Sequence, residues 1–137
     1  RLMVFWHLRP GYLADNAKPS PRSIFRYFRD ANRESISILL LSLADQRSTR
    51  GRLTTRQSRT QHEKVVFSLL KEYFKRLKEK KPKRLVNGDD LIKKFKLEPS
   101  PLIGKVLSQI EELQAIGKVK TKKEALKVAQ KVIKTNS

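Results

Sequence analysis

Apolar residues recur with the three-to-four-residue spacing of an amphipathic helix along most of the chain. The clearest stripe follows residue 60 and consists of Val65, Val66, Leu69, Leu70, Tyr73, Phe74 and Leu77. Residues 34–50 carry six aliphatic side chains between Ile36 and Leu43, too many for one face, so we expect a helix buried on most sides. No segment has the alternation of a strand, and the pattern predicts an all-α fold.

Residues that start or stop helices divide these stripes. Residues 1–8 form a helical run that we expect Pro10-Gly11 to close. Ser20 before Pro21 predicts an N-cap followed by a first-turn proline. Gly51 is the expected stop of the 34–50 helix.

The second half of the chain has similar signals. A hydroxyl residue followed three positions later by Glu predicts a capping box, and this spacing occurs at Thr60 with Glu63 and at Thr121 with Glu124. A short helix is expected over 89–95, and another begins at Ser100-Pro101 and ends near Gly117.

Pro82, within a lysine-rich stretch, predicts a domain boundary. We expect a helical segment over 1–80, a linker over 81–87 and a smaller helical module over 88–137. The apolar run that follows Arg1 has no capping residue before it. We therefore interpret 1–80 as the truncated end of a longer helical region.

Positive charge changes this picture from a plain helical domain to a binding protein. Lys and Arg number 32 against 13 Asp and Glu, a net charge of +19. Such an excess indicates a polyanionic partner. The charge is spread over the whole chain rather than along one amphipathic helix, which favours nucleic acid over a membrane surface. Residues 52–87, with twelve basic and three acidic residues, are the most electropositive segment.

The chain contains no cysteine, which excludes disulfides and thiolate metal sites. No secretory signal and no apolar run of membrane-spanning length is visible. We expect a cytoplasmic protein with no membrane partner.

Three segments resemble the bacterial-type tRNA nucleotidyltransferase and poly(A) polymerase family. They are His7–Gly11 with Pro21–Asp30; Leu41–Arg47 with Arg50-Gly51; and Leu85–Leu91 with Leu97–Gly104, Gly117–Val119 and Thr121–Leu126. The segment from Leu41 is similar to the closing helix of the family's HD-type helical region, and the segment from Leu85 is similar to its C-terminal tail. The resemblance implies a protein that helps to add or repair the 3′-terminal CCA of tRNA, or part of it.

The family's catalytic head carries a Gly-Ser pair followed by Asp-x-Asp, and neither arrangement occurs in this chain. The resemblance therefore implies no nucleotide addition by the chain alone. It implies tRNA as partner, together with a head, on the same or another polypeptide, that uses Mg²⁺ and CTP or ATP. No cofactor is expected in this chain. A poly(A) polymerase fragment and a stand-alone basic helical nucleic-acid-binding module remain the alternatives.

Two acidic patterns are weak candidates for metal sites. Gly88-Asp89-Asp90 occurs in the metal-binding hairpin of some polymerases, but apolar residues follow it at helical spacing, which favours a helix cap. His7, Asp45 and His62 suggest an HD-type metal set, but the His-Asp dipeptide is absent. We expect no metal site.

Arginine is dense between Arg47 and Arg59 among small polar residues, and guanidinium groups bind phosphate oxygens through paired hydrogen bonds. The helix start at Ser100, with Gly104 and Lys105, offers free N–H groups and positive charge to a phosphate. The alternatives are a solvated loop and an ordinary helix cap. The predicted RNA contacts are Arg47, Arg50, Arg52, Arg56, Arg59, Lys64, Lys83, Arg84, Ser100, Gly104 and Lys105.

Overall fold

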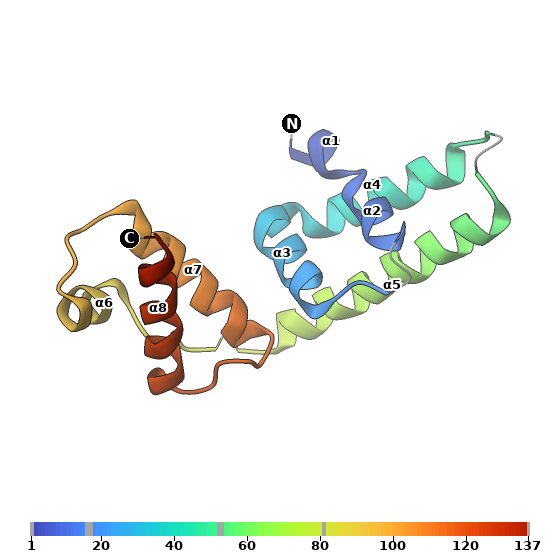
Figure 1. Ribbon diagram of the computed structural model, residues 1–137. Coiled ribbons are helices and arrows are strands. Elements are labelled where there is room, and N and C mark those ends of the chain that lie inside the picture. Colours follow the sequence, from blue (N-terminus) through green and yellow to red (C-terminus); the bar gives the residue numbers. More distant parts are fainter. Residues whose placement is uncertain (1, 16–17, 52–53, 81, 137) are drawn as a thin grey trace. The chain divides into compact units, whose positions relative to one another are not determined.

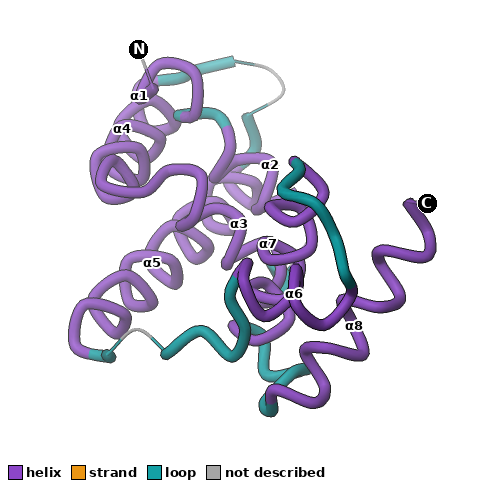
Figure 2. Tube along the Cα trace, turned by 90° about the vertical axis from the view of Figure 1, so that its left-hand side faces the viewer, coloured by secondary structure: helices purple, strands orange, loops and turns teal. Residues whose placement is uncertain are grey.

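The structure, a computed structural model, describes residues 2–15, 18–51, 54–80 and 82–136, and within these it contains helices but no strand (Figures 1 and 2). The predicted all-α fold is confirmed. Contacts divide the chain into two compact units, Arg1–Lys80 (unit 1) and Lys81–Ser137 (unit 2), which are described separately. The helices are α1 (Leu2–Trp6), α2 (Arg9–Asp15), α3 (Pro21–Ala31), the 3-10 helix η1 (Asn32–Glu34), α4 (Ser35–Ser48), α5 (Arg56–Lys78), α6 (Gly88–Phe95), α7 (Pro101–Ala115) and α8 (Lys122–Asn136).

Unit 1 is organised around the long helix α5. Helices α4 and α2 pack along α5, while α1 and α3 pack on α4 (Figure 1). The buried core draws on four of these helices and consists of Ala14, Tyr27, Ala31, Ile38, Leu39, Val65, Val66 and Leu69. The stripe predicted from the sequence therefore forms the core over its first half.

Tyr27 ties α3 to its neighbours. Its ring is fully buried and its hydroxyl donates a hydrogen bond to the Ser35 carbonyl at 2.7 Å. Burial raises the pKa of this hydroxyl well above its ordinary value, against a smaller lowering by Arg9. The Tyr27 ring meets Phe28 edge-on at 5.1 Å between centroids, and the Arg76 guanidinium of α5 lies 4.7 Å over the Phe28 ring.

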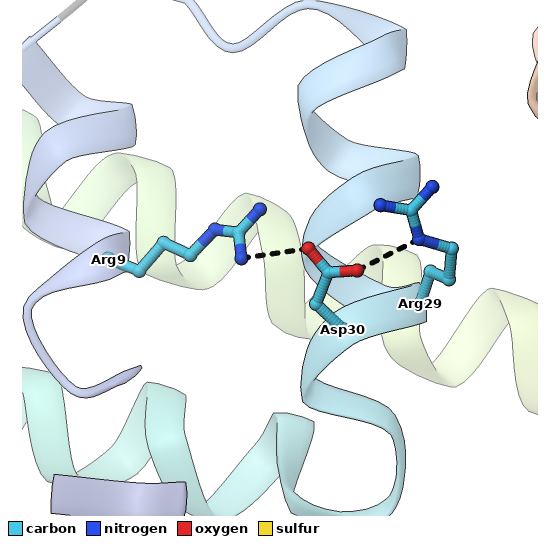
Figure 3. A network of polar contacts seen from close by, with 3 residues as sticks. All are labelled: Arg9, Arg29 and Asp30. Carbon is cyan, nitrogen blue, oxygen red and sulfur yellow. Dashed lines mark hydrogen bonds and ion pairs between the residues drawn. The ribbon is translucent and has the colours of Figure 1, made fainter. Parts of the chain in front are cut away.

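A carboxylate joins α2 to α3 (Figure 3). Asp30 accepts a hydrogen bond from Arg9 Nη1 at 3.0 Å and a second from Arg29 Nε at 2.8 Å. Burial by itself raises the pKa of Asp30, but the two guanidinium groups outweigh it, and the net pKa lies below its ordinary value of 3.8.

Three helix ends in unit 1 differ from the prediction. Pro10 and Gly11 lie inside α2 rather than closing a helix, because a first-turn proline lacks only an N–H that has no intrahelical partner anyway. Helix α4 ends at Ser48 instead of near Gly51, with Thr49 extended. Helix α5 begins at Arg56 rather than near Thr60.

The start of α5 is fixed by a different cap. The hydroxyl of Thr55 accepts a hydrogen bond from the backbone N–H of Ser58 at 3.1 Å, and this takes precedence over the predicted Thr60 cap. Thr60 instead lies inside the helix and donates to the carbonyl of Arg56. At the other end of α5, Phe74 is 52% exposed and Leu77 65% exposed, so the apolar stripe extends beyond the buried core of unit 1.

Unit 2 packs α7 against α8, with α6 contacting both. Its core consists of Val86, Leu91, Ile103, Val106, Ile110, Val119, Ala125 and Ala129. Val86 thus belongs to this core, although it falls in the stretch expected to be a linker.

The helix boundaries predicted for unit 2 are confirmed. Asn87 and Asp90 form a capping box at the start of α6, so Gly88-Asp89-Asp90 is a helix start. Gly117 follows α7 with a φ of +75°, a conformation that favours glycine. Thr121 and Glu124 cap the start of α8, as their spacing predicted.

The connection between α4 and α5 depends on Arg59. Its Nη2 donates a hydrogen bond to the Thr49 carbonyl at 3.1 Å, which joins the first turn of α5 to the residue that follows α4. Arg50, the residue after Thr49, is exposed. Two arginines of the same segment therefore differ in how closely they are tied to the fold.

Replacing Asp30 with Asn should lower the free energy of unfolding by about 0.5–1 kcal/mol at pH 7, since it removes the paired charge. A carboxyl group with a lowered folded pKa contributes stability above its unfolded pKa and loses it as the pH falls through the folded pKa. The difference between the two proteins should therefore shrink as the pH falls below about 4. Urea denaturation at pH 7 and pH 3 measures both values, and an equal difference at the two pH values would contradict the assigned role.

Replacing Arg59 with Gln should lower the free energy of unfolding by about 1 kcal/mol, because the hydrogen bond to the Thr49 carbonyl is lost. The matched control, Arg50→Gln, should change it by less than about 0.5 kcal/mol. Equal effects of the two substitutions in urea denaturation would mean that Arg59 does not hold the connection.

Candidate nucleic-acid interface

The exposed side of α5 carries a row of lysines, Lys64, Lys71, Lys75 and Lys78, called here the lysine stripe. The first three line one shallow groove of about 600 Å³, together with Phe67, whose ring is 47% exposed. At a rise of about 1.5 Å per residue, the stripe extends for roughly 21 Å along the helix. This surface is linear, basic and interrupted by one aromatic ring.

Both acidic residues that line the same groove are neutralised within unit 1. Glu63 accepts a hydrogen bond from Arg47 Nε at 3.0 Å, and Glu72 accepts one from Arg76 Nε at 2.8 Å. Lys75 lies 3.8 Å from Glu79, a looser pair between exposed side chains. The arginines therefore cancel the groove carboxylates, and the lysine charge faces solvent.

The structure separates the predicted arginine contacts into two kinds. Arg47 and Arg59 have partners in unit 1, the Glu63 carboxylate and the Thr49 carbonyl, so their guanidinium groups already take part in contacts within the fold. Arg50, just after the end of α4, and Arg56, the first residue of α5, are both exposed. Arg52 lies outside the described residues.

Three of the predicted contacts in unit 2, Ser100, Gly104 and Lys105, lie at the start of α7. Ser100 occupies the N-cap position, but its side chain makes no capping hydrogen bond, and Lys105 is exposed one turn on. Gly104 and Arg84 line one hollow of about 250 Å³. A Cβ added at Gly104 would meet no atom within 4 Å, so close helix packing does not require this glycine.

Lys83 is held at the other end of α7. The Lys83 carbonyl accepts a hydrogen bond from Gln114 Nε2 at 2.8 Å, which anchors the segment before α6 to α7, and its side chain is exposed. The structure thus brings Arg84 and Gly104 to one hollow, but it places Lys83 beside the C-terminal end of α7, away from Ser100 and Lys105. It leaves Lys64 as the sole predicted member of the lysine stripe.

Of this stripe, only Lys64 was predicted from the sequence as a contact, and Lys71, Lys75 and Lys78 were not singled out. Their signal was present, because offsets of seven, eleven and fourteen from Lys64 repeat on one face of a helix. That signal becomes usable once the opposite face is known to be buried.

The candidate metal residues His7, Asp45 and His62 line one hollow of about 530 Å³ in unit 1. His62 is only 5% exposed, and its Nε2 lies 3.0 Å from the Ser42 hydroxyl. Across the described ranges, no three His, Cys, Asp or Glu side chains gather as a metal site would require.

No helix in the described part of the chain has the length and apolarity to cross a membrane.

Comparison with known proteins gives the family. Residues 34–129 match the family described as tRNA nucleotidyltransferase domain 2. The CC-adding tRNA nucleotidyltransferase of Synechocystis sp. is 40% identical over 73 residues, which are 51% of this chain and 17% of that protein. The chain thus spans about a sixth of the length of this relative. No solved structure matches. Because the family match covers more than half of the chain and includes the lysine stripe and the start of α7, the chain belongs to the tRNA nucleotidyltransferase domain 2 family.

Proposed function

We propose that this chain is a tRNA-binding part of a tRNA nucleotidyltransferase and holds the acceptor and T arms for a catalytic head. The observation that carries the proposal is the lysine stripe on α5, where the two carboxylates that line the groove, Glu63 and Glu72, are paired with arginines. A row of solvated ammonium groups on a rigid helix is suited to a phosphate backbone.

Recognition would depend on shape and phosphate position. The major groove of an RNA helix is too narrow and deep for side chains to read, so a protein that holds stacked RNA arms contacts mainly phosphates and 2′-hydroxyls. The stripe extends for roughly 21 Å, enough to follow several phosphates along one strand. Phosphate contacts of this kind fix the position of the partner without reading its bases.

Unit 2 would supply a further phosphate contact. Ser100 is the N-cap residue of α7, but its side chain makes no capping hydrogen bond. Lys105 adds positive charge about one turn later. Helix N-termini bind phosphate through free N–H groups and the helix dipole. Arg84 and the uncrowded Gly104 beside this helix would let a sugar-phosphate strand approach.

The Synechocystis relative indicates the reaction in which such a grip would serve. That protein is a CC-adding enzyme, and the matched part is 17% of it. We place the Mg²⁺ and the CTP or ATP of that chemistry on a catalytic head, on the same or another polypeptide. The role of this chain would be to hold the tRNA while its 3′ end reaches that head.

The chain should bind tRNA with a strong dependence on salt. If about five phosphates are neutralised, the logarithm of the binding constant should fall with the logarithm of salt concentration at a slope of about −4. This is a loss of roughly a few-hundred-fold between 50 and 200 mM salt. Fluorescence anisotropy with labelled tRNA measures the slope, and a slope near zero would contradict a phosphate grip.

The same assay separates this proposal from its alternatives. Tighter binding of folded tRNA than of duplex DNA with equal charge supports a tRNA-holding role. Equal binding of tRNA and poly(A) at all salt concentrations would favour a poly(A) polymerase fragment. Equal binding of tRNA and duplex DNA would favour a general nucleic-acid-binding module.

Replacing the lysine stripe with glutamine (K64Q, K71Q, K75Q and K78Q) should make the salt slope shallower by about 3 units, at roughly 0.7–0.9 per lost contact. Affinity at 100 mM salt should fall by on the order of tenfold or more, equally for all tRNAs, because these contacts read no bases. Anisotropy titrations at four salt concentrations give both values.

The matched control removes the same charge from α8 through K123Q, K127Q, K131Q and K134Q, all exposed positions in unit 2. Its slope should change less than that of the stripe variant. Equal loss in the two variants would show that net charge alone matters, and a larger loss in the α8 variant would move the grip to unit 2. A circular-dichroism melt of each variant confirms that it is folded.

A further inference from the structure

The hollow of unit 1 is walled by three helices that contact one another, α2, α4 and α5. Its volume of about 530 Å³ is that of a site for a small organic molecule, and larger than a single ion needs. Ala14, Ser42 and His62 are buried there, whereas Tyr12, at 65% exposure, lies toward solvent. None of these residues belongs to the lysine stripe.

The lining of the hollow is rich in carboxamides. Gln46, Gln57 and Gln61 each offer both donors and an acceptor, the complement of a nucleobase edge. The Oε1 atom of Gln46 is buried and has no hydrogen-bond partner among the described residues. A buried acceptor left unpaired is costly, so turning this amide toward a ligand N–H in the hollow would be stabilising.

One edge of the hollow is the N-terminus of α5, a helix of 23 residues. The Thr55 hydroxyl takes the N–H of Ser58, while the first-turn N–H groups of Arg56 and Gln57 have no intrahelical carbonyl to meet. The helix dipole adds partial positive charge there, and the side chain of Arg56, the first residue of α5, is exposed. This edge is suited to an anion and the interior to a polar ring.

We propose that the hollow binds one unstacked nucleotide of the RNA, with its base among the glutamines and its phosphate at the N-terminus of α5. The Tyr12 ring is placed to stack on the base, which is how proteins hold bases splayed out of single-stranded RNA. The inference rests on the proposed RNA-binding function. It adds a contact with a base to the phosphate contacts proposed for the lysine stripe.

The first test follows ligand binding directly by ¹H–¹⁵N NMR on the full chain. The probes are the single-stranded tetranucleotides rA₄ and rC₄, with inorganic phosphate as the reference. At least one tetranucleotide should shift the side-chain amide signals of Gln46 and Gln57, whereas phosphate should shift only backbone signals in the first turn of α5. Tetranucleotide shifts no wider than those from phosphate would overturn the proposal, because the site would then be an anion seat only.

The second test uses variants that keep the size of the side chains. Gln46→Met with Gln57→Met removes the amides, and the matched control is Gln109→Met with Gln130→Met, two exposed positions in unit 2. The hollow variant should bind rA₄ or rC₄ about tenfold more weakly than wild type, and a blunt RNA duplex equally well. The control should bind all of them like wild type.

Three further results decide between the two proposals. Equal loss of tetranucleotide and duplex binding in the hollow variant overturns the nucleotide site and leaves the lysine grip intact. Failure of the wild-type chain to bind tRNA overturns the proposed function, while the NMR titration still reports on the hollow. If the double variant does not fold, Tyr12→Ala, at an exposed position, replaces it, and unchanged tetranucleotide affinity in that variant counts against the site.

Discussion

The packing of one side of α5 against α4 and α2 is the constraint on which the rest of unit 1 depends. Val65, Val66 and Leu69 are buried on that side. A helix has only one orientation that buries a given stripe, so this contact also fixes what faces solvent. The lysine stripe is therefore displayed as a consequence of the core, and the first turn of α5 is brought beside α2 and α4, where the hollow forms.

A chain with a charge of +19 must also limit its own repulsion. Its few carboxylates are used for this purpose within each unit. Asp30 accepts from Arg9 and Arg29, and in unit 2 the hydrogen bond from Lys122 is the main reason that the pKa of Asp90 lies below its ordinary value. Once these pairs are formed, most of the remaining charge is an unbalanced lysine excess at the surface. A bound polyanion would relieve that repulsion and stabilise the folded chain by mass action.

Most of the fold could be predicted from the sequence, because long apolar stripes and local caps are properties of neighbouring residues. The caps of unit 2 involve side chains only three positions apart, and they form as their spacing predicted. At α5 the sequence pattern predicted a start near Thr60, and the Thr55 cap adds a turn in which Arg59 hydrogen-bonds to the Thr49 carbonyl. The exposure of Phe74 and Leu77 could not be predicted, since it depends on where the other helices end. The candidate site was harder to predict for a related reason. Arginine is a residue type that binds phosphate, but the sequence does not show that Arg47 pairs with Glu63, which becomes its neighbour only when α4 lies along α5.

These contacts imply that charge and shape determine different properties of RNA binding, its affinity and its selectivity. Lysines on a straight helix bind any closely spaced row of phosphates, and they supply affinity without a preference among RNA helices. A preference for tRNA must then come from features that a uniform duplex lacks, such as an unstacked nucleotide or a fixed separation between two phosphate contacts. The hollow beside the N-terminus of α5 provides for the first of these within unit 1 alone. An affinity built mainly by the lysine stripe and a selectivity built mainly by the hollow would then be separable properties of one small helical unit.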